Sequence, residues 1–247
     1  MALDTQAKLE KFRAEKHSAF IMGYTGETGK EIVRELANLK LFERVLLIGR
    51  RKIDLGPDIG PEFEQVLVDF ENIESHEEIF EGIDVGICCL GTTRQAAKSA
   101  QNFVRIDHDF VLRTASLAKS SSCKHFLYQS SHGADKNSSI LYSRTKGQVE
   151  EALKVMHFQR LSIFRPGLLL CNREESRPSE FFFRTLLKPI SYFFPTAITS
   201  PTEVVARAIV NNIISAPDNN TEVYENRAIH FLAGKSKKCE TLTHAEL

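Results

Sequence analysis

The sequence predicts a single-domain α/β fold built on a doubly wound parallel β-sheet. Short apolar runs of strand length alternate with amphipathic stretches of helix length along most of the 247 residues. Continuous apolar strands separated by helices are typical of parallel sheets that are covered on both faces. A glycine-rich turn follows the first apolar run, in "FIMGYTGETGKEIV" at residues 20–33. Such sheets bind ligands beyond the carboxyl ends of their strands, which is where this turn is expected to lie.

The expected elements follow one another in a regular order. Residues 1–17 are expected to form a lead-in helix with Leu9 and Phe12 on one side. Further helices are expected near 28–39, 73–80, 100–119 and 142–156. The expected strands are "AFIMG", "RVLLIGR", "EQVLVDF", "DVGICCLG", "HFLYQSS" and "RLSIFRPG".

The main domain is expected to span residues 18–233, with a small helical cap on its substrate side at 171–200. The aromatic stretch "EFFFRTLLKPISYFFP" in that cap fits three uses: the core of the cap, the lining of an apolar pocket, or a protein-binding patch. Residues 234–247 contain few apolar side chains, so we expect a flexible tail there.

Composition excludes several classes of protein. Lysine plus arginine (32) balances aspartate plus glutamate (32), so no overall field attracts nucleic acid, and we expect no direct nucleic-acid binding. No apolar stretch approaches the roughly 20 residues of a transmembrane helix. The polar start of mixed charge is unlike a secretory signal or a transit peptide. The expected location is cytoplasmic, with the nucleus as a second compartment.

The five cysteines form an odd set without a C-x-x-C pair, so the sequence indicates neither a disulfide framework nor a metal site. Cys88 and Cys89 are adjacent at the end of an apolar run. We interpret them as buried core residues, and a redox switch is the less favoured alternative.

Three glycines within residues 23–29 are spaced three residues apart, where the first strand gives way to a helix. In a phosphate-binding loop one glycine permits a tight turn, another lets backbone N–H groups approach a pyrophosphate, and the last allows close packing of helix on strand. The alternative is an ordinary strand-to-helix turn. The predicted phosphate-binding residues are Gly23, Thr25, Gly26, Glu27, Thr28 and Gly29.

The end of the second strand bears on the choice of cofactor. Dinucleotide-binding sheets often place an acid there, about 20 residues after the glycines, to hold the ribose 2′-hydroxyl. Here "LIGRR" has Arg50 and Arg51, whose guanidinium groups suit a 2′-phosphate and favour NADPH over NADH. The alternative is a pair of solvated arginines. Later strand ends are expected to place Asp69 near the adenine edge, and Leu90 and Gly91 along the cofactor.

Candidate catalytic residues lie in "QSSHGADKNSSILYSRTKGQVE". Tyr142 and Lys146 are four residues apart at the start of a helix and therefore share a face. A tyrosine that exchanges a proton with a carbonyl compound needs its phenolate stabilised, and a neighbouring ammonium supplies part of that stabilisation. Ser131, or in its place Ser130, is expected to hydrogen-bond the substrate oxygen.

These motifs resemble the short-chain dehydrogenase/reductase family, in its atypical branch. The strings "GETGK", "LIGRRK", "CCLGTTR", "CKHF", "SSHGADK" and "FRPGLLLCNREESRP" are similar to the HIV Tat-interacting-protein group of tumour-suppressor oxidoreductases. The resemblance covers about residues 18–232. It implies a Rossmann fold that binds NADPH.

The resemblance also implies roles for single residues and for partners. Tyr142 would be the general acid/base, Lys146 would hold the nicotinamide ribose and Ser131 would orient an unidentified carbonyl substrate. Leu169 would lie near the nicotinamide, and Arg177 would reach the cofactor phosphates. Nuclear import receptors, a translation elongation factor and the transcription machinery are the implied protein partners. The alternative is a redox-sensing regulator that binds NADPH and these partners with little turnover.

One residue departs from the pattern that many members of the family share. They carry an asparagine on the helix after the fourth strand, as part of a proton path to the lysine. Here "VRIDHDF" offers Asp107 at the comparable place. This difference favours the regulatory alternative over efficient catalysis.

Overall fold

The computed structural model describes residues 2–170 and 199–234. Its strands form a seven-stranded sheet and a separate two-stranded sheet. The larger sheet contains β1 (Ser18–Met22), β2 (Arg44–Gly49), β3 (Phe63–Leu67), β4 (Val85–Cys88), β5 (His125–Gln129), β6 (Arg160–Arg165) and β9 (Thr221–Glu225). The smaller one pairs β7 (Leu168–Leu170) with β8 (Thr199–Pro201). The expected cap lies largely outside the described residues.

The strand order of the large sheet is β3-β2-β1-β4-β5-β6-β9, and every neighbouring pair is parallel. The chain reverses its direction of travel across the sheet between β1 and β4, where Met22 pairs with Cys88. In doubly wound sheets this switch point opens a crevice at the carboxyl ends of the strands, and ligands bind there. The predicted fold class is therefore confirmed.

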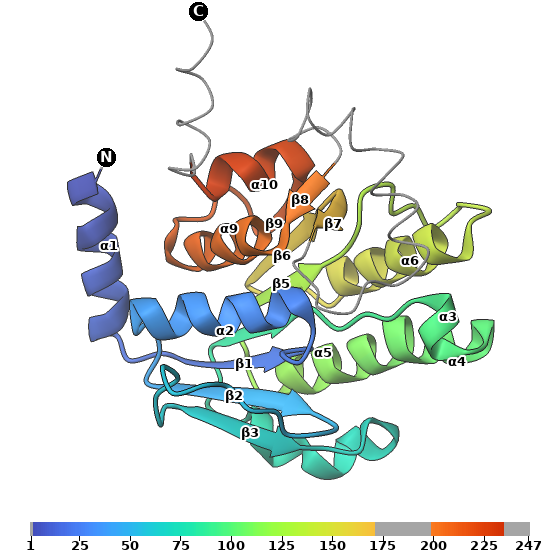
Figure 1. The fold of residues 1–247 in the computed structure, drawn as a ribbon, viewed down its shortest axis with the longest axis horizontal. Coiled ribbons are helices and arrows are strands. Elements are labelled where there is room, and N and C mark those ends of the chain that lie inside the picture. The colour runs from blue at the N-terminus through green and yellow to red at the C-terminus, as the bar shows by residue number, and fades with distance from the viewer. Residues whose placement is uncertain (1, 171–198, 235–247) are drawn as a thin grey trace, which may run out of the picture.

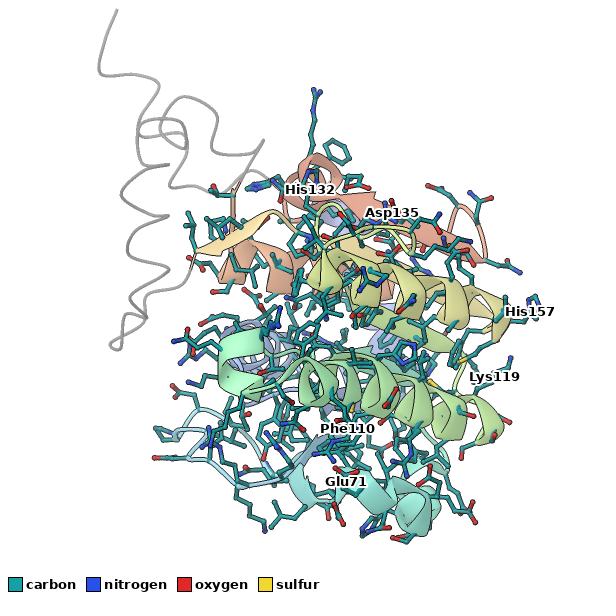
Figure 2. All side chains as sticks on the ribbon, turned by 90° about the vertical axis from the view of Figure 1, so that its right-hand side faces the viewer. Glu71, Phe110, Lys119, His132, Asp135 and His157 are labelled. Carbon is teal, nitrogen blue, oxygen red and sulfur yellow. The ribbon has the colours of Figure 1, made fainter. Side chains whose placement is uncertain are left out.

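Helices cover both faces of the sheet (Figure 1). One face packs against α1 (Ala2–Ala14), α2 (Glu27–Leu39), α9 (Thr202–Ile214) and α10 (Asn226–Leu232). The other face packs against the 3₁₀ segment η1 (Phe70–Phe80), α5 (Phe110–Ser120) and α6 (Leu141–Val155). Figure 2 shows η1, α5 and α6 side by side across that face, with Phe110 on the middle helix.

The apolar strands are explained by this double covering. Along β1, Phe20 and Met22 join the core beneath α5 and α6, while Ile21 joins the core beneath α2 and α9. Successive side chains of a strand point to opposite faces, so a strand that is buried on both sides needs an unbroken apolar run. Burial of each large apolar side chain contributes about 1.5–3 kcal/mol.

Two helical segments differ from the expected ones. The segment expected at 100–119 consists of α4 (Ala100–Val104), a π-helical turn at Arg105–Asp109, and α5. The π-helical turn carries Asp107, which is buried. The helix expected near 73–80 is the longer 3₁₀ segment η1. The sequence patterns did not predict α9, β9 or α10.

Candidate functional site

The glycine loop after β1 lies against the end of β4. Gly23 has a φ of +93°, and a Cβ atom at this position would lie 2.6 Å from the carbonyl carbon of Cys89. A Cβ atom on Gly29 would lie 2.3 Å from the carbonyl oxygen of Gly23. Glycine is thus required at both positions, at Gly23 for the turn and at Gly29 for close packing of α2 on the loop.

Gly26 has a different role, because it is the N-cap of α2 and no side chain caps that helix. A Cβ atom at Gly26 would meet only the Gly23 carbonyl oxygen, at 3.3 Å. Its φ of −82° is open to any residue, so a valine at this position would not strain the backbone. The uncapped N–H groups of a helix N-terminus are donors for an anion, which fits a cofactor phosphate.

The remaining loop residues that we predicted to bind phosphate lie around this helix start. Thr25 and Glu27 are half-buried, and Thr28 is buried in the first turn of α2. The Glu27 carboxylate lies 3.6 Å from the Lys30 ammonium, which offsets its negative charge near the expected phosphates.

Arg50 and Arg51 directly follow β2, and both are exposed. Within residues 2–170 and 199–234 neither guanidinium group has a hydrogen-bond or ion-pair partner. The backbone of Arg51, however, is hydrogen-bonded, because the Tyr24 hydroxyl donates to the Arg51 carbonyl oxygen at 2.7 Å. The two cations are therefore available to an anionic ligand at the end of β2.

Asp69 is engaged by its own chain. Its carboxylate accepts hydrogen bonds from the Glu71 backbone N–H at 3.0 Å and from the Asn72 side chain at 2.7 Å. These two bonds lower the pKa of Asp69. The residue is the N-cap of η1, so this local role accounts for its position, and contact with an adenine edge stays a prediction.

Lys146 and Asp107 form a buried ion pair next to Gly91. The Lys146 Nζ atom lies 3.1 Å from Asp107 Oδ1, and the two side chains are 4% and 0% exposed. Asp107 Oδ2 accepts a hydrogen bond of 2.8 Å from the backbone N–H of Thr92. A Cβ atom at Gly91 would lie 3.4 Å from Asp107 Oδ1 and 3.6 Å from Lys146 Nζ. The loop after β4, with Leu90 half-buried beside Gly91, therefore lies directly against this pair.

Tyr128 on β5 is a third member of this cluster, and we did not predict it. The Lys146 ammonium lies 5.3 Å from the centre of the Tyr128 ring. Burial alone would lower the pKa of Lys146, but Tyr128 and Asp107 raise it well above its usual value, so the ammonium stays charged at neutral pH. A tyrosine directly after the apolar pair "FL" of this strand was the available signal.

Tyr142 lies one helical turn before Lys146 on α6 and is 41% exposed. Its ring packs against Phe103, with the ring centres 5.9 Å apart. Tyr142 contributes, after Tyr128 and Asp107, to the raised pKa of Lys146. The arrangement is an exposed tyrosine one helical turn from a buried ammonium.

The two candidate serines differ in their surroundings. Ser130 is buried, and its hydroxyl donates to Glu150, whose carboxylate also accepts hydrogen bonds from Arg165. Ser131 lies two residues beyond the end of β5 and is half-buried. Its hydroxyl makes only a 3.3 Å bond to the His132 carbonyl oxygen among the described residues. Of the two, Ser131 is the one whose hydroxyl remains available.

Gly147 positions the start of α6 against the loop that carries the serines. A Cβ atom on Gly147 would lie 2.3 Å from the backbone nitrogen of Lys136. The residue directly follows Lys146, and a glycine inside a helix is unfavourable by about 1 kcal/mol relative to alanine. Because glycine destabilises a helix interior, Gly147 in the sequence was a signal that the helix packs closely against another segment there.

Cys88 is buried and Cys89 is half-buried at the end of β4. Burial raises the pKa of Cys88 to about 12 and raises that of Cys89 as well, which disfavours the thiolate that a redox switch requires. Leu169 is on β7 and is 38% exposed. Arg177 lies outside the described residues.

Comparison with known proteins agrees with these features. A family model described as NAD(P)H-binding matches residues 23–176. The rat protein HTATIP2 is 44% identical over 234 residues, which cover 94% of this chain and 96% of the relative. The Emericella nidulans protein fmp52, whose name includes "mitochondrial", is 32% identical over 197 residues and covers 77% of this chain and 84% of its own length.

Solved structures share the fold at low sequence identity. UDP-glucuronic acid 4-epimerase from Bacillus cereus in complex with NAD has a TM-score of 0.65 and 16% identity, covering 84% of this chain and 76% of the other. MoeE5 in complex with UDP-glucose and NAD has a TM-score of 0.64 and 14% identity, covering 84% and 75%. Identities this low support the fold alone.

The sequence, the strand order and the relatives lead to one assignment. Among the helices that the structure describes, none is long and apolar enough to span a membrane. The matched range begins at Gly23 of the glycine loop and includes Asp107, Tyr142 and Lys146. The chain belongs to the NAD(P)H-binding, short-chain dehydrogenase/reductase-like Rossmann family that includes HTATIP2, as the sequence resemblance predicted.

Proposed function

We propose that the protein is an NADPH-dependent oxidoreductase that reduces a carbonyl compound. The observation that carries this proposal is the buried Lys146 ammonium, 3.1 Å from Asp107 and adjacent to Gly91, with the exposed Tyr142 one helical turn away. Gly91 lies three residues after β4, the strand that borders the switch point of the sheet. A positive charge kept at that point suits both a cofactor ribose and a tyrosine that must release its proton.

The cofactor would lie across the carboxyl ends of β1 and β4. The glycine loop and the uncapped start of α2 would hold the pyrophosphate, and Arg50 and Arg51, which have no partner among the described residues, would hold a 2′-phosphate. Leu90 and Gly91 would lie beside the nicotinamide half, with Leu169 and Arg177 added from the substrate side. NADPH would supply the hydride.

The protein's own residues would manage the proton. The Tyr142 hydroxyl would donate to the substrate oxygen, and the Lys146 ammonium would stabilise the phenolate that remains. Lowering a tyrosine pKa from about 10 to neutral pH requires about 4 kcal/mol. The ammonium supplies part of this in its buried position, where water screens it poorly. Ser131 would orient the substrate oxygen, because the Ser130 hydroxyl is held by Glu150.

Turnover of the purified protein tests this proposal. NADPH oxidation would be followed over a panel of carbonyl compounds for the parent and for Tyr142→Phe. We expect the variant to lose about 10² or more in turnover, because the proton donor is removed, while NADPH affinity changes little. Tyr224→Phe is the matched control, since its hydroxyl accepts a hydrogen bond from Asn212 on α9, on the face of the sheet opposite α6. A Tyr142→Phe variant as active as the parent would refute the mechanism.

The preference for NADPH is tested by calorimetric titration. We expect NADPH to bind about tenfold or more tighter than NADH, since hydrogen bonds to charged groups contribute roughly 1.5–3 kcal/mol. Replacing Arg50 and Arg51 with alanine should remove most of the difference. Gly26→Val should block both cofactors by filling the space above the uncapped start of α2. Equal affinities in the parent would contradict the proposed specificity.

A second candidate function is an NADPH-dependent regulator with little turnover. The observation that favours it is the ion pair itself, because a carboxylate that already holds Lys146 competes with a cofactor ribose for the same ammonium. Nuclear import receptors, a translation elongation factor and transcription proteins are the partners that the resemblance implies. Pull-down of these partners with and without NADPH tests this second function. A partner that prefers the NADPH-bound protein must also tighten NADPH binding by the same factor.

The cellular location also remains a prediction. Relatives named fmp52 are described as mitochondrial, whereas we predict a cytoplasmic protein that also enters the nucleus. Cell fractionation with compartment markers distinguishes the two.

A further inference from the structure

Tyr24 is an unexpected residue in the glycine loop. Its neighbours from Gly23 to Gly29 are small or polar, yet its large ring is fully buried and belongs to the core beneath α2. The ring passes the last residue of β2, because a Cβ atom at Gly49 would lie 2.7 Å from Tyr24 Cε1. The side chain therefore runs from the loop after β1 to the end of the neighbouring strand.

The hydroxyl of Tyr24 ends between two acceptors. It lies 2.7 Å from the carbonyl oxygen of Arg51 and 2.9 Å from Oε1 of Gln65 on β3. Gln65 is oriented by Ile53, because its Oε1 accepts from the Ile53 N–H at 2.8 Å and its Nε2 donates to the Ile53 carbonyl at 2.9 Å. Both neighbours of the hydroxyl are thus acceptors, so Tyr24 is the donor. Burial raises the pKa of Tyr24, which keeps this proton in place at neutral pH.

Three backbone groups after β2 are therefore held by side-chain hydrogen bonds. They are the carbonyl of Arg51 and both the N–H and the carbonyl of Ile53. The guanidinium groups of Arg50 and Arg51 have no partner in the described parts of the chain. Their position therefore depends on the backbone that carries them, and Tyr24 connects that backbone to the phosphate-binding loop.

We propose that Tyr24 is a positioning residue for cofactor specificity, whose hydroxyl holds the Arg50–Arg51 backbone in the place where a 2′-phosphate binds. This inference rests on the proposed function, in which these arginines select NADPH. Without the hydroxyl, part of the ordering of the arginine loop would have to accompany binding, and affinity would fall accordingly. NADH has no 2′-phosphate and makes no use of the arginines, so its affinity would stay the same.

The experiment compares Tyr24→Phe with the parent by calorimetric titration of NADPH and NADH. Phenylalanine keeps the buried ring and removes only the donor. We expect NADPH to bind about three- to tenfold more weakly, the range that one net hydrogen bond allows, with NADH affinity unchanged. Gln65→Met, which removes the other part of the connection, should act in the same direction. Tyr224→Phe loses a tyrosine hydroxyl contact on β9 and should change neither affinity.

A second measurement tests the connection without any cofactor. Hydrogen exchange of the Ile53 amide should be faster in Tyr24→Phe than in the parent. If the parent prefers NADPH and Tyr24→Phe keeps both the parent affinity ratio and the parent exchange rate, the inference is wrong. An equal loss for NADPH and NADH also overturns it, because the residue would then support the fold in general. If the parent protein binds NADPH and NADH equally well, the proposed cofactor specificity itself is wrong. The titration of the parent alone gives that result, before any variant is compared.

Discussion

Two buried ion pairs lie at opposite ends of the sheet and differ in how fully their carboxylates are hydrogen-bonded. At the amino ends of β6 and β9, Glu222 accepts from Arg160 at 2.9 Å, from Ser162 at 3.0 Å and from the Asp218 N–H at 3.2 Å. At the carboxyl ends, Asp107 pairs with Lys146 and accepts, among the described residues, one further hydrogen bond, from the Thr92 N–H.

The carboxyl-end pair has hydrogen-bonding capacity that the described residues do not use. Apart from the Lys146 ammonium 3.1 Å away, Asp107 Oδ1 has no donor among the described residues, and the nearby Tyr128 hydroxyl has no hydrogen-bond partner there. In the amino-end pair, Nη2 of Arg160 also has no partner among these residues. Buried polar groups normally have partners, and ligands of a parallel sheet bind at the carboxyl ends of its strands, so we expect the carboxyl-end pair to serve a functional site. We expect the amino-end pair to stabilise the fold only.

The largest effect is expected from Lys146→Met. It leaves the Asp107 carboxylate buried with a single donor, which should lower the free energy of unfolding by about 3–5 kcal/mol. Turnover should be lost and NADPH affinity should fall, because the ammonium is gone. Urea denaturation and the NADPH oxidation assay measure the two consequences. Lys154→Met is the matched control on the same helix, where a partly exposed pair with Glu151 should matter little.

A double variant separates stability from function at this end of the sheet. Adding Asp107→Asn to Lys146→Met removes the uncompensated charge, so most of the lost stability should return while turnover stays absent. A double variant with the turnover of the parent would show that the carboxyl-end pair is only structural.

A smaller effect is expected from Arg160→Met at the amino end. Glu222 keeps the Ser162 and Asp218 donors, so the loss of stability should be about 2–3 kcal/mol, below that of Lys146→Met. Because this pair lies at the end of the sheet away from the glycine loop, NADPH affinity of the folded protein should not change. If folded Arg160→Met bound NADPH clearly more weakly than the parent, the proposed difference in role between the two ion pairs would be wrong.

The smallest effect concerns pH. His125 donates to Ser162 at 2.9 Å, and burial together with Arg160 lowers the pKa of His125 well below its usual value. In the unfolded chain His125 becomes protonated near pH 6.5, whereas in the folded protein it stays neutral at that pH. The free energy of unfolding therefore falls as the pH falls. Between pH 7.5 and 5.5 this group should remove about 1.4 kcal/mol. Urea denaturation of the parent and of His125→Gln at both values measures it, and equal losses in the two proteins would contradict the assignment.

The sequence alone determined the main architecture of the protein. Unbroken apolar runs predicted parallel strands buried on both faces, and the spacing of Gly23, Gly26 and Gly29 predicted the turn at the switch point. Tyr142 and Lys146 were predicted to share a face of one helix. These features depend on local periodicity, which the order of residues records directly.

Contacts between distant segments were decided only by the tertiary structure. Asp107 was noticed as a departure from a family pattern, but its pairing with Lys146 depends on the π-helical turn and on the packing of α6. The availability of Ser131 rather than Ser130 depends on Glu150, twenty residues after Ser130. Tyr24 meets Arg51 and Gln65 because β1, β2 and β3 are neighbours in the sheet. A hydrogen bond between segments far apart in the chain needs a defined distance and direction, and only the packed fold supplies them.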